Sequence, residues 1–147
     1  MKHLRYLRYV LKHKWFVFYA GLKTGAPLRA LIIHDWSKFT KEEWFPYVEN
    51  FYGGERTPEV KTAFRKAFRL HASRNPHHWQ YWSEGRSTPE RIPDPYVREM
   101  VADWMGAGRA ITGSWDLREW YAANKEKQQL NPYTRAQVEA LIAKVKI

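Results

Sequence analysis

Apolar residues recur three and four positions apart along nearly the whole chain, and this spacing restricts the fold more than any other feature. It places apolar side chains on one face of an α-helix, whereas a half-buried strand needs strict alternation of apolar and polar residues. The sequence contains no convincing alternating segment and no internal repeat. It therefore predicts an all-α protein.

Glycine, proline and helix-capping residues mark where these helices should begin and end. Thr40 with Glu43, and Thr134 with Gln137, have the spacing of N-terminal capping boxes. Pro46 should kink or divide its helix, because proline lacks the backbone N–H. The six or seven predicted helices cover residues 2 to about 22, 40 to about 52, 57 to about 74, 94 to about 113, 114 or 116 to about 130, and 134 to 146, with a short apolar segment at 28–33.

We expect these helices to form a single compact domain over residues 1–147. This length corresponds to about one domain, and no linker separates two parts of the chain. Residues 75–93 form a long connection, and connections of this length are often functional. Residues of chemical interest lie between about 10 and 113, whereas 114–147 contain apolar anchors and no histidine. The last segment is expected to cover the helices that carry the site.

Composition limits the classes of function that are open to the chain. It has no cysteine, which excludes disulfides, zinc–thiolate sites, iron–sulfur clusters and cysteine nucleophiles. No apolar run approaches the roughly 20 residues of a transmembrane helix, and the basic N-terminus lacks the features of a signal peptide, so we expect a cytoplasmic protein. The net charge of +10 favours anionic partners: a small phosphorylated molecule, nucleic acid or a membrane surface.

The strongest chemical signal in the sequence is the hexapeptide His34-Asp35-Trp36-Ser37-Lys38-Phe39. It follows the most apolar stretch of the N-terminal half, which should deliver His34 and Asp35 to the interior. A carboxylate buried there needs a cation or several hydrogen bonds, unless Asp35 only caps the next turn. Lys38 is protonated near pH 7 and cannot coordinate a metal in that form. We therefore expect Lys38 to bind an anionic group of a substrate.

Further metal-ligand residue types occur in widely separated segments, namely His13, His71, His77, His78 and Asp103. His13 and His71 lie on apolar helix faces, where a hydrogen-bonded core histidine is the alternative. We expect one of the adjacent pair His77 and His78 to bind metal and the other to serve the second coordination shell or the substrate; the alternative is a solvated pair. Imidazoles and carboxylates together suit divalent metals, so convergence predicts one or two ions of Mn, Fe, Mg, Zn or Co.

The doublet His34-Asp35, with Lys38 three residues after the aspartate, resembles the HD-domain superfamily of metal-dependent phosphohydrolases, which is all-helical. The segment from residue 34 to residue 113 also resembles small proteins found in bacterial and phage genomes. The resemblance to the superfamily implies a first metal held by His13, His34, Asp35 and Asp103, and a second held by Asp35, His71 and either His77 or His78.

The resemblance implies hydrolysis of a phosphate ester, as a phosphomonoesterase or phosphodiesterase acting on a nucleotide or a related small molecule. A metal would lower the pKa of a bound water and polarise the phosphoryl group. Asp35 and Lys38 are the expected catalytic residues. Lys38 and Arg109 would neutralise phosphate charge, and Trp79 could stack on a nucleobase, although packing of the long connection is its alternative role.

Two other functions remain open at this stage. A di-iron oxygenase of the HD superfamily would use the same histidine-rich ligand set, and iron content with oxygen consumption would distinguish it. A basic nucleic-acid-binding helical module is the third reading, because Arg5, Arg8 and Lys12 lie on one face of the first helix among tyrosines. No nucleic-acid-binding motif is present, and affinity that falls steeply with salt would support this reading.

Overall fold

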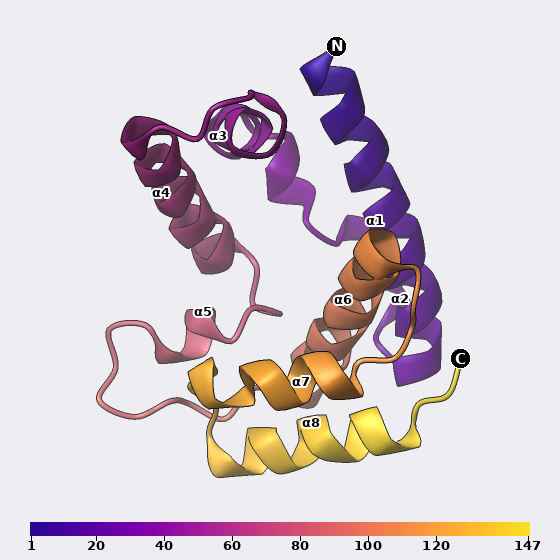
Figure 1. Ribbon diagram of the computed structural model, residues 1–147. Helices are drawn as coiled ribbons and strands as arrows, with labels where there is room; N and C mark the ends of the chain where they lie inside the picture. Colours follow the sequence, from indigo (N-terminus) through magenta and orange to yellow (C-terminus); the bar gives the residue numbers. More distant parts are fainter.

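The computed structural model describes residues 1–147 and contains helices joined by turns and loops, with no strand (Figure 1). The elements in chain order are α1 (Lys2–Thr24), α2 (Leu28–Ile33), the 3₁₀ turn η1 (Trp36–Phe39), α3 (Lys41–Tyr52), α4 (Pro58–Arg74), α5 (Gln80–Ser83), α6 (Asp94–Thr112), α7 (Arg118–Asn124), the 3₁₀ turn η2 (Lys125–Lys127) and α8 (Pro132–Lys144). The all-α prediction is confirmed. The helix number is higher than predicted because the short helices α2 and α5 form in segments that were expected to be connections.

Most long helices begin and end where local sequence signals predicted. Thr57 caps α4, since its Oγ1 accepts a hydrogen bond from the backbone N of Val60 at 3.2 Å, and Pro58 occupies the first helical position. Gly113 ends α6 with a φ of 79°. This left-handed conformation is one that glycine adopts without strain, which is why it commonly follows the last helical turn.

One prediction for α3, the capping box, was wrong, and one of the two alternatives for Pro46 is excluded. Pro46 does not divide the helix, which continues to Tyr52. Proline is the sixth residue of this helix, so it removes a single backbone bond, to the carbonyl oxygen of Glu42, and the helix continues past it. The capping box of Thr40 and Glu43 does not form either. The Thr40 hydroxyl donates to the carbonyl oxygen of Ser37 at 2.6 Å, and Glu43 turns into the interior.

The predicted start of the last helix and the extent of the one before it were also wrong. Asn131 caps α8 by accepting from the backbone N of Tyr133 at 3.0 Å. Thr134 lies inside that helix, buried, and its hydroxyl oxygen accepts from the backbone N of Ile92 at 3.0 Å. The helix expected to reach about residue 130 ends as α7 at Asn124 and continues only as the turn η2.

The long helices α1 and α6 pack along each other and form the centre of the fold. Figure 1 shows α7 and α8 across one end of α6, while α3 and α4 lie as a second pair towards the N-terminal end of α1. The main hydrophobic core contains Val17, and a smaller core beside α3 and α4 contains Val10. His13 lies between these two positions on the same buried face of α1. Polar residues therefore interrupt the interior where the two cores meet.

None of the helices combines the length and the apolar character that a bilayer crossing would require.

Candidate metal centre

Five of the six histidines and two aspartates converge in the interior at the junction of the two cores. Three groups of possible metal ligands occur here, and the two that contain an aspartate are described first; the third is His34, His77 and Glu99. The first group is His13, His34, Asp35 and Asp103, and the second is Asp35, His71, His77 and His78. All members are buried except His78, which is partly buried. Asp35 belongs to both groups, so one carboxylate joins them.

The first group brings together α1, the end of α2 and α6. His13 Nε2 lies 3.0 Å from Asp103 Oδ1 and 3.5 Å from Asp35 Oδ2. His34 Nε2 lies 3.3 Å from Asp103 Oδ1, 3.5 Å from Asp35 Oδ2 and 3.4 Å from His13 Nε2. Four donor atoms thus surround one point.

The second group adds the end of α4 and the connection that follows it. His71 Nε2 and His77 Nε2 each lie 3.2 Å from Asp35 Oδ1, the oxygen that the first group does not use. His77 Nε2 is also 3.5 Å from Asp103 Oδ2. The two oxygens of Asp35 therefore face two different sets of imidazoles, as a carboxylate does when it bridges two ions.

These separations match those of ligands around a metal ion. Donor atoms that stand about 2.1 Å from one ion lie roughly 3.0 to 3.4 Å apart at octahedral or tetrahedral angles. The first group spans 3.0 to 3.5 Å between its atoms. In the second group, several buried atoms make no hydrogen bond: Asp35 Oδ1, His71 Nε2, His77 Nε2 and His78 Nε2. Unpaired buried polar atoms are costly, and a cation would satisfy those that face the centre.

Local backbone geometry places the shared carboxylate. Asp35 follows α2 directly and has a φ of 55°, the one non-glycine residue of the chain with a positive φ. Aspartate tolerates this left-handed conformation better than most residues, but it remains unfavourable and is often found at functional sites. The sharp turn lets His34 and Asp35, adjacent in sequence, both point into the interior.

Glu99 orients the imidazole rings of His34 and His77 by contacting the ring nitrogens that face away from the ligand groups. Its Oε1 lies 2.9 Å from His34 Nδ1 and 3.1 Å from His77 Nδ1. A histidine that donates from Nδ1 to a carboxylate presents Nε2 as a free lone pair, which is the tautomer that a metal requires. Glu99 stands four residues before Asp103 on α6, so both carboxylates lie on one face of that helix.

His71 is oriented in the same way by a different set of residues. Glu43 Oε1 on α3 lies 3.1 Å from His71 Nδ1, and Ser37 Oγ lies 3.2 Å from the same atom. Asn75 donates from Nδ2 to Ser37 Oγ and to the carbonyl oxygen of His71, each at 2.8 Å. All four residues are buried. The network leaves His71 Nε2 directed at Asp35.

The carboxylates make the centre favourable for positive charge. Burial alone would lower the pKa of His13, but hydrogen bonding to Asp103 and Asp35 outweighs burial and raises it. Burial would raise the pKa of Asp35, yet the charges of His34 and Lys38 hold it well below its usual range. A bound divalent ion would stabilise the ionised carboxylates as these cationic groups do, and the imidazoles could then stay neutral.

The two adjacent histidines both reach the second group. The backbone turns at this point, since the N of His78 donates to the carbonyl oxygen of Asn75 at 3.0 Å. The expectation that one of the pair would stand apart assumed an extended segment, and the turn removes that restriction. Burial and the neighbouring His77 hold the pKa of His78 well below its usual value, so its imidazole is neutral near pH 7.

Lys38 lies against the shared carboxylate. Its Nζ is 2.6 Å from Asp35 Oδ2, and its side chain is 12% exposed. Burial opposes the charge on Lys38, but Asp35 and Asp103 outweigh it and raise the pKa of the ammonium group. Lys38 therefore stays protonated and places a fixed positive charge at the edge of the first group.

The other two predicted substrate-binding residues do not join this cluster. Arg109 lies at the end of α6, where it donates to the carbonyl oxygen of Gly113 and its guanidinium carbon is 5.5 Å from the ring centre of Trp115. It stabilises the helix end and the following loop. Trp79 packs against the main core, which is the alternative role considered for it. His3, the sixth histidine, accepts from Trp44 Nε1 at 3.0 Å near the N-terminus.

Sequence reasoning missed the residues that orient the imidazoles. The sequence assigned Glu43 to a capping box and gave Asn75 and Glu99 no role at the site. Helical spacing offered two signals: Glu99 stands four residues before Asp103, and Asn75 stands four residues after His71. No local signal connects Glu43 to His71, because these residues are 28 positions apart and on different helices.

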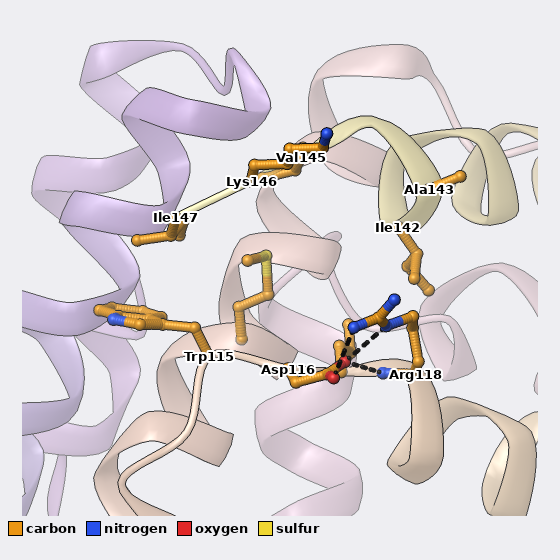
Figure 2. Close-up of a pocket in the computed structure, with 10 residues that line it drawn as sticks. Trp115, Asp116, Arg118, Ile142, Ala143, Val145, Lys146 and Ile147 are labelled. Carbon is orange, nitrogen blue, oxygen red and sulfur yellow. Dashed lines mark hydrogen bonds and ion pairs between the residues drawn. The ribbon is translucent and has the colours of Figure 1, made fainter.

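Two cavities differ in their relation to the cluster. An open cleft of about 480 Å³ reaches the outer side of His34, His77 and Glu99, and Arg29 and Arg74 make it cationic. A groove of about 560 Å³ lies in another part of the fold, between the loop before α7 and the C-terminal segment (Figure 2). It is mainly apolar, its Asp116 is paired with Arg118, and it contains no histidine. Only the first cleft touches the candidate centre.

Comparison with known proteins places the chain in a family. The model of DUF5662, a family of unknown function, matches residues 2–144. The chain belongs to DUF5662. No curated protein and no solved structure matches it significantly. The DUF5662 match covers every residue of both ligand groups but supplies no activity, so function has to be argued from the geometry.

Proposed function

We propose that the protein binds two divalent metal ions and hydrolyses a phosphate ester, with a small phosphorylated molecule such as a nucleotide as the substrate class. The observation that carries this proposal is the pair of ligand groups that share Asp35, with Oδ2 turned to one group and Oδ1 to the other. Two ions joined by a carboxylate are a recurring arrangement in enzymes that hydrolyse phosphate esters.

The chain's own residues would have distinct roles. His13, His34 and Asp103 would hold one ion, and His71, His77 and His78 the other, with Asp35 joining them. When bound, the ions would provide a water of lowered pKa and neutralise charge on a phosphoryl group. Lys38, protonated beside Asp35, would bind a phosphate oxygen through Nζ. The cationic cleft with Arg29 and Arg74 supports an anionic substrate.

The order of these ligands along an all-helical chain supports membership of the HD-domain superfamily. A histidine on an early helix, a His-Asp doublet, intervening histidines and a late aspartate follow one another, here His13, His34, Asp35, His71, His77 and Asp103. We propose this relationship on the ligand order together with their convergence. A solved structure with a recognisable HD-domain helix arrangement would test it.

Elemental analysis of protein purified without chelator tests the metal site. We expect two ions of Mn, Fe, Zn, Co or Mg per chain, and none in Asp35→Ala, because both groups lose their common ligand. Asp35→Asn keeps the shape of the side chain but lacks the negative charge. A folded Asp35→Asn protein without metal would show that the ligand, and not the fold, was lost. Asp116→Ala is the control, since the Asp116 side chain is exposed and pairs only with Arg118. Metal-free wild-type protein would contradict the proposal.

Hydrolysis is tested with p-nitrophenyl phosphate and bis(p-nitrophenyl) phosphate, which represent phosphomonoesters and phosphodiesters. We expect the metal-loaded wild-type protein to hydrolyse at least one of them and Asp35→Asn to hydrolyse neither. A protein that binds metal but hydrolyses neither, nor any nucleotide, would retain the metal site and contradict the phosphohydrolase proposal.

The number of imidazoles favours a second candidate, a di-iron oxygenase. Five histidines supply most of the ligand atoms, and imidazole suits iron as well as zinc. Iron in the purified protein together with oxygen consumption, in the absence of phosphate release, would select this function over hydrolysis.

A further inference from the structure

The N-terminal part of the molecule exposes apolar side chains on the face of α1 that is turned away from the core. Leu4, Leu11 and Leu22 are about half exposed, and Trp15 is 67% exposed. Their spacing of seven, four and seven residues places them on one side of the helix, opposite the buried side that contains His13. No other element of the chain covers this side.

The helix α2 extends this surface. Leu28 and Ile32 stand four residues apart on α2, and Ile32 is 61% exposed. Lys14 Nζ donates to the carbonyl oxygen of Ile32 at 3.4 Å, which places the end of α2 beside α1. Figure 1 shows α2 next to the C-terminal part of α1. We call the combined set the N-terminal apolar surface; it consists of Leu4, Leu11, Trp15, Leu22, Leu28 and Ile32.

The two helices that carry this surface are strongly cationic. Asp35 is the only acidic residue between positions 1 and 41, and it is buried in the candidate metal centre. The same two helices carry seven cationic residues: Lys2, Arg5, Arg8, Lys12, Lys14, Lys23 and Arg29. Exposed leucine, isoleucine and tryptophan side chains are therefore flanked by lysine and arginine. The one acidic side chain that pairs with these cations is Glu49 of α3, which contacts Lys2 at the N-terminal end of α1.

This combination selects among possible partners. A second copy of the chain would bring two cationic surfaces together, and like charges at an interface oppose association. Nucleic acid would match the charge, but phosphate contacts do not require exposed aliphatic side chains. An anionic lipid surface satisfies both properties, because its headgroups attract lysine and arginine and its acyl region accepts apolar side chains.

We propose that the N-terminal apolar surface docks the protein onto an anionic lipid bilayer. In this arrangement α1 lies along the bilayer surface, Trp15 and its aliphatic neighbours enter the boundary between headgroups and acyl chains, and the flanking cations contact lipid phosphates. The docking uses residues outside the candidate metal centre, so it does not depend on the proposed hydrolase activity.

Vesicle co-sedimentation of the full-length protein tests this docking. We expect binding to phosphatidylcholine vesicles that contain phosphatidylglycerol, and little binding to pure phosphatidylcholine. Trp15→Ser combined with Leu22→Ser should weaken binding by about tenfold or more, because apolar insertion is lost. Both positions are exposed, so the far-UV circular dichroism should stay unchanged. Ile111→Ser, at a residue that is 72% exposed on α6, is the matched control and should bind as the wild type does.

A second pair of variants tests the charge. Arg8→Gln with Lys23→Gln, at two exposed positions of α1, should weaken binding to the anionic vesicles by about tenfold at low salt, since each cation near such a surface contributes separately. Lys61→Gln with Arg65→Gln removes the same charge from the exposed side of α4 and should have little effect. Equal losses in both variants would show attraction by net charge alone and contradict a specific docking surface.

Three further results would overturn the proposal. The first is no sedimentation with anionic vesicles. The second is a wild-type dimer, detected by light scattering, that Trp15→Ser with Leu22→Ser converts to a monomer, because a second copy would then cover the surface. The third is binding to a DNA or RNA oligonucleotide that exceeds vesicle binding and is unchanged in that variant, which would assign the cations to nucleic acid.

Discussion

Glu99 illustrates how one buried side chain can determine the chemistry of several others. It does not belong to either ligand group that contains Asp35, yet it contacts the Nδ1 atoms of both His34 and His77. Burial would raise the pKa of Glu99, but its hydrogen bonds with these two histidines lower it, so the carboxylate stays ionised. An ionised acceptor at this position holds both imidazoles with Nε2 directed inward.

Glu99→Gln should weaken metal binding by about 10- to 100-fold, the range found when an outer partner of a metal-binding histidine is removed. The amide has the same shape but lacks the negative charge, so its neutral oxygen is a weaker acceptor for the two Nδ1–H groups that share Oε1. Competition with a chromophoric chelator measures the affinity. Glu90→Gln, at an exposed residue paired only with Arg86, should leave the affinity unchanged. Unchanged affinity in Glu99→Gln would show that Glu99 does not orient the ligands.

Lys38→Met should leave the metal content unchanged and lower the rate of phosphate-ester hydrolysis. Methionine keeps much of the apolar stem but removes the ammonium group that lies 2.6 Å from Asp35 Oδ2. In metal-free protein the same change should destabilise the fold by about 3 kcal/mol, because it leaves a buried carboxylate without its cation. Elemental analysis, an activity assay and urea denaturation measure the three effects. Loss of metal from Lys38→Met would refute the assignment of Lys38 to the substrate.

Among the helices, the close contact of α1 with α6 determines where the first ligand group can form. A Cβ atom on Gly106 would lie 2.5 Å from Val17 Cγ2 and 2.7 Å from the backbone N of Val17. Glycine is therefore needed for the two helices to approach this closely. His13 stands four residues before Val17, and Asp103 stands three residues before Gly106, so the ligands lie about one turn from this contact.

Gly106→Ala should destabilise the protein by about 1–3 kcal/mol, as overpacked cores do, and should weaken metal binding by moving His13 away from Asp103. Gly108→Ala is the matched control on the same helix, because the nearest atom to its added Cβ would be 3.8 Å away. That change should be neutral or stabilising by up to about 1 kcal/mol, since alanine favours the helix. Thermal denaturation with and without metal distinguishes the two variants. Equal behaviour of both would contradict the role of the close approach.

For the complete chain, the C-terminal segment is part of the core. Leu117, Tyr121, Val138 and Leu141 are buried in the same cluster as Met100 on α6. Trp115 also packs edge-on against Phe16 of α1, with ring centres 5.5 Å apart. The segment after α6 therefore covers the two helices that carry His13 and Asp103.

Truncation after Gly113 should unfold or aggregate the protein. Each large buried side chain that is removed costs about 3 kcal/mol or more, and the net stability of a domain is only about 5–15 kcal/mol. Circular dichroism and size-exclusion chromatography measure the outcome. A truncated chain that remains folded and binds metal would show that the segment is an appendage.

The all-α class, most helix ends and the residue types of the centre could be predicted from the sequence, because they depend on periodicity, caps and side-chain chemistry within a few residues. Tertiary structure decided which atoms meet. His34 and Glu99 are 65 positions apart, and Glu43 reaches His71 across 28 positions. Likewise, a turn after α4 lets His77 and His78 both approach Asp35. Such contacts depend on how the helices pack, and local patterns carry no information about the separation between distant helices.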